Sequence, residues 1–113
     1  DPENRIYLTT DDGSFGISGN VMNAYAELNN SGKHKIFTCG PIGMMESVRQ
    51  GVHKNSIPCD LALERIMACG FGICQGCTVE RKSKGNKTDG YRNRFALACM
   101  DGPIFSIDEI IQC

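Results

Sequence analysis

CGFGICQGC, the segment Cys69–Cys77, governs the C-terminal half of this chain, because its three cysteines follow the spacing C-x4-C-x2-C. The glycines between them, Gly70, Gly72 and Gly76, lack a Cβ and reach positive φ, so the main chain can approach an inorganic core. Backbone N–H groups can then point at the sulfur atoms. A fourth cysteine, Cys99, stands farther along the chain. The segment is therefore predicted to be a metal-ligand loop.

The spacing is typical of plant-type [2Fe-2S] ferredoxins, in which one loop supplies three thiolates and a distant strand supplies the fourth. We therefore predict that one [2Fe-2S] cluster is bound by Cys69, Cys74, Cys77 and Cys99. Such a centre carries one electron at a time.

Other cysteine chemistries fit the spacing less well. A structural zinc site usually has two short knuckles, and here only Cys74–Cys77 forms one. A c-type haem needs a histidine where Thr78 stands, and neither His34 nor His53 has the spacing of a Rieske ligand. The odd count of seven cysteines argues against a disulfide scaffold. Zinc and a thioredoxin-like C-x-x-C stay open as alternatives.

Composition narrows the class of protein. The chain has 113 residues, 41% of them hydrophobic, which predicts a globular protein with one modest core or two small ones. The net charge of −1 gives no general attraction to nucleic acid or to a membrane. No apolar run approaches the roughly 18 residues of a membrane span, and no leader opens the chain, so a cytoplasmic location is predicted. Because Asp1 comes first, we interpret the sequence as a piece of a longer protein.

The N-terminal half is predicted to alternate strand and helix, as in a parallel α/β sheet. Asn20 is a candidate helix cap, Asn29–Gly32 a stop signal, and Met44, Met45 and Val48 fall on one helical face. The expected elements are a buried strand at Arg5–Thr9, a helix at Val21–Leu28, a strand at Lys35–Cys39 and a helix that begins near Pro41.

The segment Asn55–Pro58 breaks the helical pattern, and the sequence after it is rich in cysteine and glycine. This change predicts a boundary between domains 1–55 and 56–113. In the second domain Asp60–Met67 is expected to form a short helix that leads into the cysteine loop. Strands at Thr78–Glu80 and Phe95–Cys99 are expected to form a hairpin, which would return Cys99 toward Cys77.

Four stretches carry a family resemblance: TTDDGSFG (Thr9–Gly16), CGPIGMM (Cys39–Met45), ERIMACG (Glu64–Gly70) and CMDGPIF (Cys99–Phe105). In this order they resemble the iron–sulfur flavoprotein subunits that deliver electrons to dihydroorotate dehydrogenase. The resemblance spans nearly the whole chain, and the order of the motifs is more specific than any one of them.

The resemblance implies a three-part protein of the ferredoxin-reductase type, with an FAD-binding barrel, an NAD-binding α/β domain and a C-terminal [2Fe-2S] domain. Residues 1–55 would be the C-terminal half of the parallel-sheet NAD-binding domain, and 56–113 the small α+β cluster domain with its hairpin. The chain has no G-x-G-x-x-G loop and no flavin-barrel sequence. A flavin must stand between a hydride carrier and a one-electron cluster, so this chain is not expected to be catalytic by itself.

The implied function is electron transfer from NADH through FAD to the cluster, and on to the FMN of a catalytic dihydroorotate dehydrogenase subunit in pyrimidine biosynthesis. The full-length protein would then form a hetero-oligomer. Related flavoprotein subunits serve NADH-dependent ferredoxin:NADP reductases and sulfide dehydrogenases; their first cluster ligand is often aspartate, so Cys69 favours the dihydroorotate type. A non-enzymatic zinc or iron–sulfur binding module is the alternative of a different class.

Two loops are candidates for the nucleotide, because ligands of parallel sheets bind at the carboxyl edge. The resemblance places a cysteine matching Cys39 beside the nicotinamide, and the alternative for Cys39 is a small buried thiol. The candidate residues are Asp11, Asp12, Gly13 and Ser14 in one loop and Cys39, Gly40 and Pro41 in the other.

The segment Arg81–Arg94 is rich in basic residues and longer than its counterpart in the family. Charge runs are usually solvated, so an exposed hairpin tip is the first interpretation, and a docking surface for an acidic partner is the second. Nucleic acid is disfavoured because no aromatic ladder accompanies the charge. Cys59 is expected to pack near the helix that precedes the cluster loop, whereas the sequence assigns no role to Cys113. The basic residues are Arg81, Lys82, Lys84, Lys87, Arg92 and Arg94, against the acid Asp89.

Overall fold

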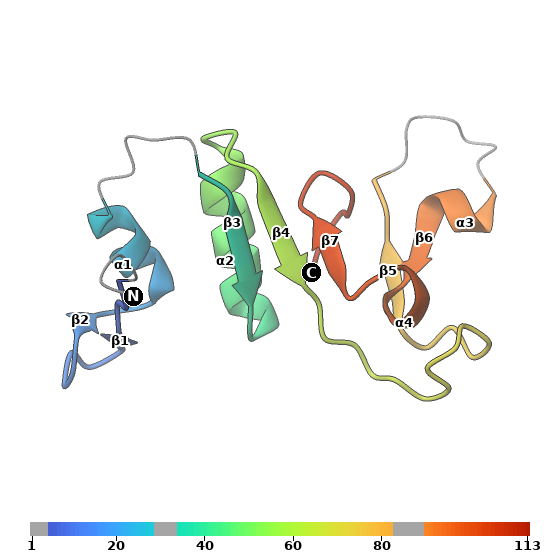
Figure 1. Cartoon of the computed structure of the whole chain (residues 1–113), viewed down its shortest axis with the longest axis horizontal. Coiled ribbons are helices and arrows are strands. Elements are labelled where there is room, and N and C mark those ends of the chain that lie inside the picture. Colours follow the sequence, from blue (N-terminus) through green and yellow to red (C-terminus); the bar gives the residue numbers. More distant parts are fainter. Residues whose placement is uncertain (1–4, 29–33, 83–89) are drawn as a thin grey trace. The chain divides into compact units, whose positions relative to one another are not determined.

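The computed structural model describes residues 5–28, 34–82 and 90–113, and it divides the chain into two compact units, residues 1–33 and 34–113 (Figure 1). Each unit is described separately below. In the described part of the chain, no helix is both long enough and apolar enough to traverse a bilayer.

The first unit holds a pair of short parallel strands and a capped helix. Strand β1 (Thr9–Thr10) pairs with β2 (Ile17–Ser18), and α1 (Val21–Glu27) follows. The side chain of Asn20 accepts a hydrogen bond of 2.9 Å from the Met22 N–H, and the Asn23 side chain accepts one from the Asn20 N–H. This capping box satisfies N–H groups that the first turn of a helix leaves free, so the predicted cap is confirmed. The predicted stop signal at 29–32 lies outside the described residues.

The prediction of a buried strand at Arg5–Thr9 is wrong. Within that range only Thr9 belongs to a strand, and Ile6 and Leu8 are 85% and 51% exposed. An apolar strand is buried on both faces when its sheet is covered on both sides. The two-stranded sheet of this unit has too little area to bury these side chains in that way.

The second unit contains a three-stranded sheet in the order β3-β4-β7 (Figure 1). Strand β3 (Ile36–Cys39) runs parallel to β4 (Cys59–Ala62), and the crossover between them is α2 (Ile42–His53). Strand β7 (Ile104–Ser106) lies antiparallel to β4 on its other side. The strand at 36–39 and the helix after Pro41 were predicted and are confirmed. The buried side chains of this core are Met45, Val48 and Val52 of α2, Leu61 of β4 and Phe105 of β7.

The helix predicted at Asp60–Met67 is wrong, because residues 60–62 belong to β4 and residues 63–67 form neither helix nor strand. Burial alternates along this stretch: Cys59, Leu61 and Leu63 are buried, while the residues between them are half-buried. A period of two belongs to a strand. Hydrogen-bonding neighbours on both sides, β3 and β7, complete the backbone pairing that a helix would have supplied internally.

The predicted hairpin is confirmed by β5 (Thr78–Glu80), which pairs antiparallel with β6 (Phe95–Leu97). A short helix, α3 (Tyr91–Arg94), precedes β6. Cys99, however, lies in the helical turn α4 (Ala98–Asp101) and not in the strand as predicted. The carboxylate of Asp101 accepts a 2.8 Å hydrogen bond from the Leu97 N–H, which favours the turn over a longer strand. Lys84, Lys87 and Asp89 of the basic segment lie outside the described residues.

The chain thus combines helices with parallel and antiparallel strands, so the expected α/β class is confirmed at that level. The assignment of residues 1–55 to part of an NAD-binding domain and the domain boundary after residue 55 stay predictions.

Candidate metal centre

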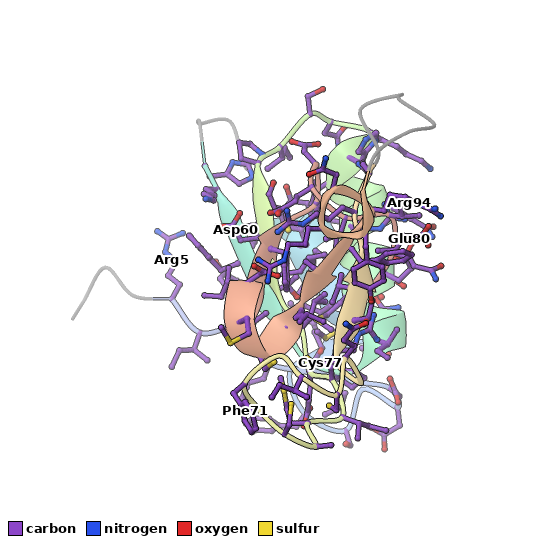
Figure 2. All side chains as sticks on the ribbon, turned by 90° about the vertical axis from the view of Figure 1, so that its right-hand side faces the viewer. Arg5, Asp60, Phe71, Cys77, Glu80 and Arg94 are labelled. Atoms are coloured by element: carbon purple, nitrogen blue, oxygen red, sulfur yellow. The ribbon has the colours of Figure 1, made fainter. Side chains whose placement is uncertain are left out.

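The cysteine loop, Cys69–Cys77, connects the irregular segment after β4 to the first residue of β5. Figure 2 shows sulfur atoms gathered in this loop, where Phe71 and Cys77 are labelled. All seven cysteines are free thiols. Cys77 is buried, Cys69 and Cys99 are half-buried, and Cys74 is exposed.

Two of the predicted ligands meet across the hairpin. The Sγ atom of Cys77 lies 3.2 Å from the Sγ atom of Cys99. The β5–β6 ladder explains this approach, because Thr78 pairs with Leu97 and the Ala98 N–H donates to the Cys77 carbonyl at 3.0 Å. The ladder holds the two ends of the hairpin opposite each other.

The other two predicted ligands are linked through the loop backbone. The N–H of Cys74 donates a hydrogen bond of 3.4 Å to the Sγ atom of Cys69. The N–H of Gly76 donates one of 3.4 Å to the Sγ atom of Cys74. Amide dipoles directed at sulfur favour the negatively charged thiolate, which is the form that binds metal.

The electrostatics of the thiols follow this geometry. Hydrogen bonds from the backbone of Cys74, and next from that of Phe71, lower the pKa of Cys69 to about 6. The backbone of Cys99 and then its thiol lower the pKa of Cys77, while the neighbouring Cys77 sulfur raises the pKa of Cys99. Two negative charges at contact distance repel each other, so this pair needs a positive centre to become fully ionised.

At Gly72 the cysteine loop approaches the hairpin closely. Its φ is +86°, which L side chains rarely adopt, and a Cβ there would lie 3.1 Å from Cγ of Met100 and 3.5 Å from Cδ1 of Leu97. The loop therefore packs on β6 and α4, and a glycine at this position lets it do so.

The four thiols meet as two pairs and not as one closed set. In residues 5–28, 34–82 and 90–113, no three Cys, His, Asp or Glu side chains surround one point as a single bound ion would need. In a [2Fe-2S] centre held by four cysteines, each of the two irons takes two thiolates. The pairs Cys69 with Cys74 and Cys77 with Cys99 fit that donor set.

The predicted nucleotide residues lie in two different units. Asp11–Ser14 form the turn after β1. The Ser14 N–H donates a hydrogen bond of 3.0 Å to the Asp12 carboxylate, and this hydrogen bond lowers the pKa of Asp12. In the second unit, Cys39–Pro41 end β3 and lead into α2. The side chain of Cys39 is exposed. Whether one nucleotide contacts both loops stays a prediction.

The remaining cysteines are buried in the second unit. Cys59 stands in β4, where burial raises the pKa of its thiol. Burial and next the neighbouring Glu46 carboxylate raise the pKa of Cys113 to about 11. Neither thiol lies in the cysteine loop, and the burial of both disfavours the thiolate, which is the reactive form.

Two arginines line pockets that the sequence did not predict. Arg65 lines a pocket of about 540 Å³ together with Gly40 and Pro41, and its buried Nε atom has no hydrogen-bond partner in the described structure. Arg92 lines a second pocket beside the cysteine loop. The ERIMACG motif marked the first residue and the basic segment the second, but neither pattern separates a pocket residue from a solvated one.

Comparison with known proteins agrees with this geometry. Residues 64–111 match the model of the iron–sulfur cluster binding domain of dihydroorotate dehydrogenase B. All four predicted ligands lie within the matched residues of the dihydroorotate dehydrogenase B domain, whereas Asp11–Ser14 and Cys39–Pro41 lie outside them.

Curated relatives extend the similarity to nearly the whole chain. A probable dihydroorotate dehydrogenase B (NAD(+)) electron transfer subunit of Thermoplasma volcanium is 34% identical over 97% of this chain. The corresponding subunit of Streptococcus pneumoniae serotype 4 is 36% identical over 95%. The chain spans 38% and 39% of the length of these two relatives.

A solved structure is similar as well. It is a chain from the structure of an NADH-dependent reduced ferredoxin-NADP oxidoreductase described for flavin-based electron bifurcation. The TM-score is 0.73 and the sequence identity 29%, over 94% of this chain and 35% of the other. This chain therefore shares its fold with the part of that oxidoreductase chain that it covers.

Proposed function

We propose that this chain binds one [2Fe-2S] cluster through Cys69, Cys74, Cys77 and Cys99 and relays single electrons. The observation that carries the proposal is the pairing of the four thiols, with 3.2 Å between the sulfurs of Cys77 and Cys99. The match of residues 64–111 to an iron–sulfur domain supports the same donor set.

The residues of the loop would hold the centre and adjust its potential. Cys69 and Cys74 would bind one iron, and Cys77 and Cys99 the other. When bound, the cluster supplies reversible one-electron chemistry. N–H groups such as that of Gly76 stabilise negative charge on sulfur, and reduction adds negative charge, so these hydrogen bonds raise the reduction potential.

We further propose that the full-length protein passes electrons between NAD(H), FAD, the cluster and the FMN of a catalytic dihydroorotate dehydrogenase subunit in pyrimidine biosynthesis. In the dehydrogenase direction the electrons leave dihydroorotate and reduce NAD⁺, and with NADH the same chain runs in reverse and reduces orotate. The names of the relatives as electron transfer subunits support this proposal. Asp11–Ser14 and Cys39–Pro41 would contact the nucleotide, and a hetero-oligomer in the cytoplasm is part of the same proposal.

A second candidate is the flavoprotein subunit of an NADH-dependent ferredoxin:NADP reductase. The similar solved structure, with its TM-score of 0.73, supports it. Cys69 at the first ligand position favours the dihydroorotate type, and the choice of electron acceptor separates the two.

Anaerobic purification of the protein after expression with ample iron tests the cluster. We expect about two irons and two acid-labile sulfides per chain, and a rhombic paramagnetic resonance signal after reduction. Stoichiometric zinc without labile sulfide would contradict the proposal. Reduction of orotate or of NADP by the NADH-supplied full-length protein, with the matching catalytic subunit, then distinguishes the two candidate functions.

A further inference from the structure

A pocket of about 440 Å³ lies beside the cysteine loop, within the second unit. One wall comes from the loop itself and the other from the base of the basic segment, α3 and α4. The residues that matter below are Phe71, Arg81, Tyr91, Arg92, Met100 and Asp101.

Part of this pocket is apolar and exposed. Phe71 and Met100 are each 62% exposed, and Tyr91 is 48% exposed. The Tyr91 ring rests on Phe95 with 4.9 Å between ring centres, and its hydroxyl lies 3.4 Å from that of Thr78. Rigid aromatic side chains that are exposed around a pocket are typical of interaction sites.

The charged groups of the pocket favour an anionic occupant. Among the described residues, the buried Nε atom of Arg81 has no hydrogen-bond partner, while its Nη2 atom lies 3.4 Å from the Glu109 carboxylate. Arg92 is exposed, and no ion pair of its side chain occurs within the described ranges. The acid Asp101 is already engaged, because its Oδ2 accepts from the Leu97 N–H at 2.8 Å. The guanidinium groups of this pocket thus keep N–H donors that no described acceptor uses. A carboxylate is the group whose two oxygens fit the paired N–H donors of a guanidinium.

The pocket also touches the ligand loop. Gly72 lies between Phe71 and Cys74 and packs against Met100, which lines the same pocket. Any occupant would therefore rest against the loop that carries three of the four thiols. A protein held there would bring its own redox group close to the cluster, and electron transfer needs that closeness.

We propose that this pocket docks an acidic side chain, Asp or Glu beside an apolar residue, of the catalytic subunit that exchanges electrons with the cluster. The inference rests on the proposed function, since a redox partner of the cluster has to lie close to this loop. The carboxylate pairs with Arg92, and the apolar neighbour packs on Phe71 and Tyr91.

The test measures binding of the cluster-loaded full-length protein to the purified catalytic dihydroorotate dehydrogenase subunit of the same organism. Titration calorimetry compares wild type with Arg92→Glu and Arg92→Gln at about 50 mM and about 300 mM salt. Lys54→Glu is the matched control. This substitution changes the charge by the same amount as Arg92→Glu, and Lys54 is also exposed but does not line the pocket. Iron content and thermal unfolding establish that each variant is folded and loaded.

We expect Arg92→Glu to weaken binding about tenfold at low salt and less at high salt, with Arg92→Gln in between and Lys54→Glu within about twofold of wild type. Tight binding of wild type and Arg92→Glu alike would overturn the pocket while leaving the proposed electron transfer intact. No binding by wild type would overturn the partner, and the pocket with it. Concentration-dependent self-association that Arg92→Glu abolishes would assign the pocket to a second copy and would also overturn the proposal.

Discussion

The Sγ atom of Cys77 lies 3.2 Å from the Sγ atom of Cys99. Cys77 directly precedes β5 and Cys99 stands two residues after β6, so the two thiols meet at the open end of the hairpin. The antiparallel pairing of β5 and β6 holds them together, and the Ala98 N–H donates to the Cys77 carbonyl at 3.0 Å. Half of the proposed donor set is therefore organised by a β-ladder, and the other half by the N–H groups of a glycine-rich loop.

Replacing Cys77 by serine should abolish the cluster, because one iron would lose a thiolate from its pair. We expect loss of the visible absorption and of the paramagnetic signal of the reduced protein. Cys39→Ser is the control, since that exposed thiol lies outside the loop and its replacement should leave both signals unchanged. A full cluster content in Cys77→Ser would contradict this ligand assignment.

Gly72→Ala should destabilise the protein by about 1–2 kcal/mol, because φ of +86° and the short approach to Met100 both disfavour a Cβ. Gly43→Ala is a matched control in α2, where a Cβ meets nothing within 4 Å, and it should stabilise by about 0.5–1 kcal/mol. Thermal unfolding of the two variants should therefore shift the Tm in opposite directions. A Tm for Gly72→Ala equal to that of wild type would show that the loop does not need glycine here.

The ion pair between Glu46 and Arg49 on α2 predicts a pH dependence of stability. The hydrogen bond from Arg49 lowers the pKa of Glu46 from 4.5 to about 2. The pair therefore stabilises the folded state fully above about pH 4.5, and this contribution is lost as the pH falls through about 2. Because the Glu46 side chain is 27% exposed, we expect only about 0.5 kcal/mol.

Urea unfolding of wild type and Glu46→Gln between pH 6 and pH 2 measures that contribution as a difference. Acid lability of the cluster is common to both proteins and so cancels. The two proteins should differ at pH 6 and converge toward pH 2. A constant difference across this range would show that the Glu46 carboxylate is not the titrating group.

Cys39→Ala in the full-length protein should slow reduction of FAD by NADH about tenfold, if Cys39 lies beside the nicotinamide as proposed. Stopped-flow spectroscopy follows the flavin, and the cluster spectrum should not change. Val21→Ala, which changes an exposed side chain of α1, serves as a control. Hydride transfer at the wild-type rate in Cys39→Ala would remove this residue from the nucleotide site.

Local features of the chain could be predicted from sequence. The Asn20 cap, the helix that starts after Pro41 and the spacing of the three loop cysteines each depend on residues within a few positions of one another. Helices and caps form from such near neighbours, because their hydrogen bonds join residues close in sequence.

Other features were decided only by tertiary structure. Residues 59–62 became β4 and not a helix because β3 and β7 offered backbone partners on both sides, and no local pattern shows that two such partners exist. The contact of Gly72 with Met100 and the exposure of Ile6 likewise depend on segments distant in sequence. Strand pairing and burial join residues that only the folded chain brings together, whereas the prediction of the four thiol ligands rests on the spacing of cysteines in the sequence.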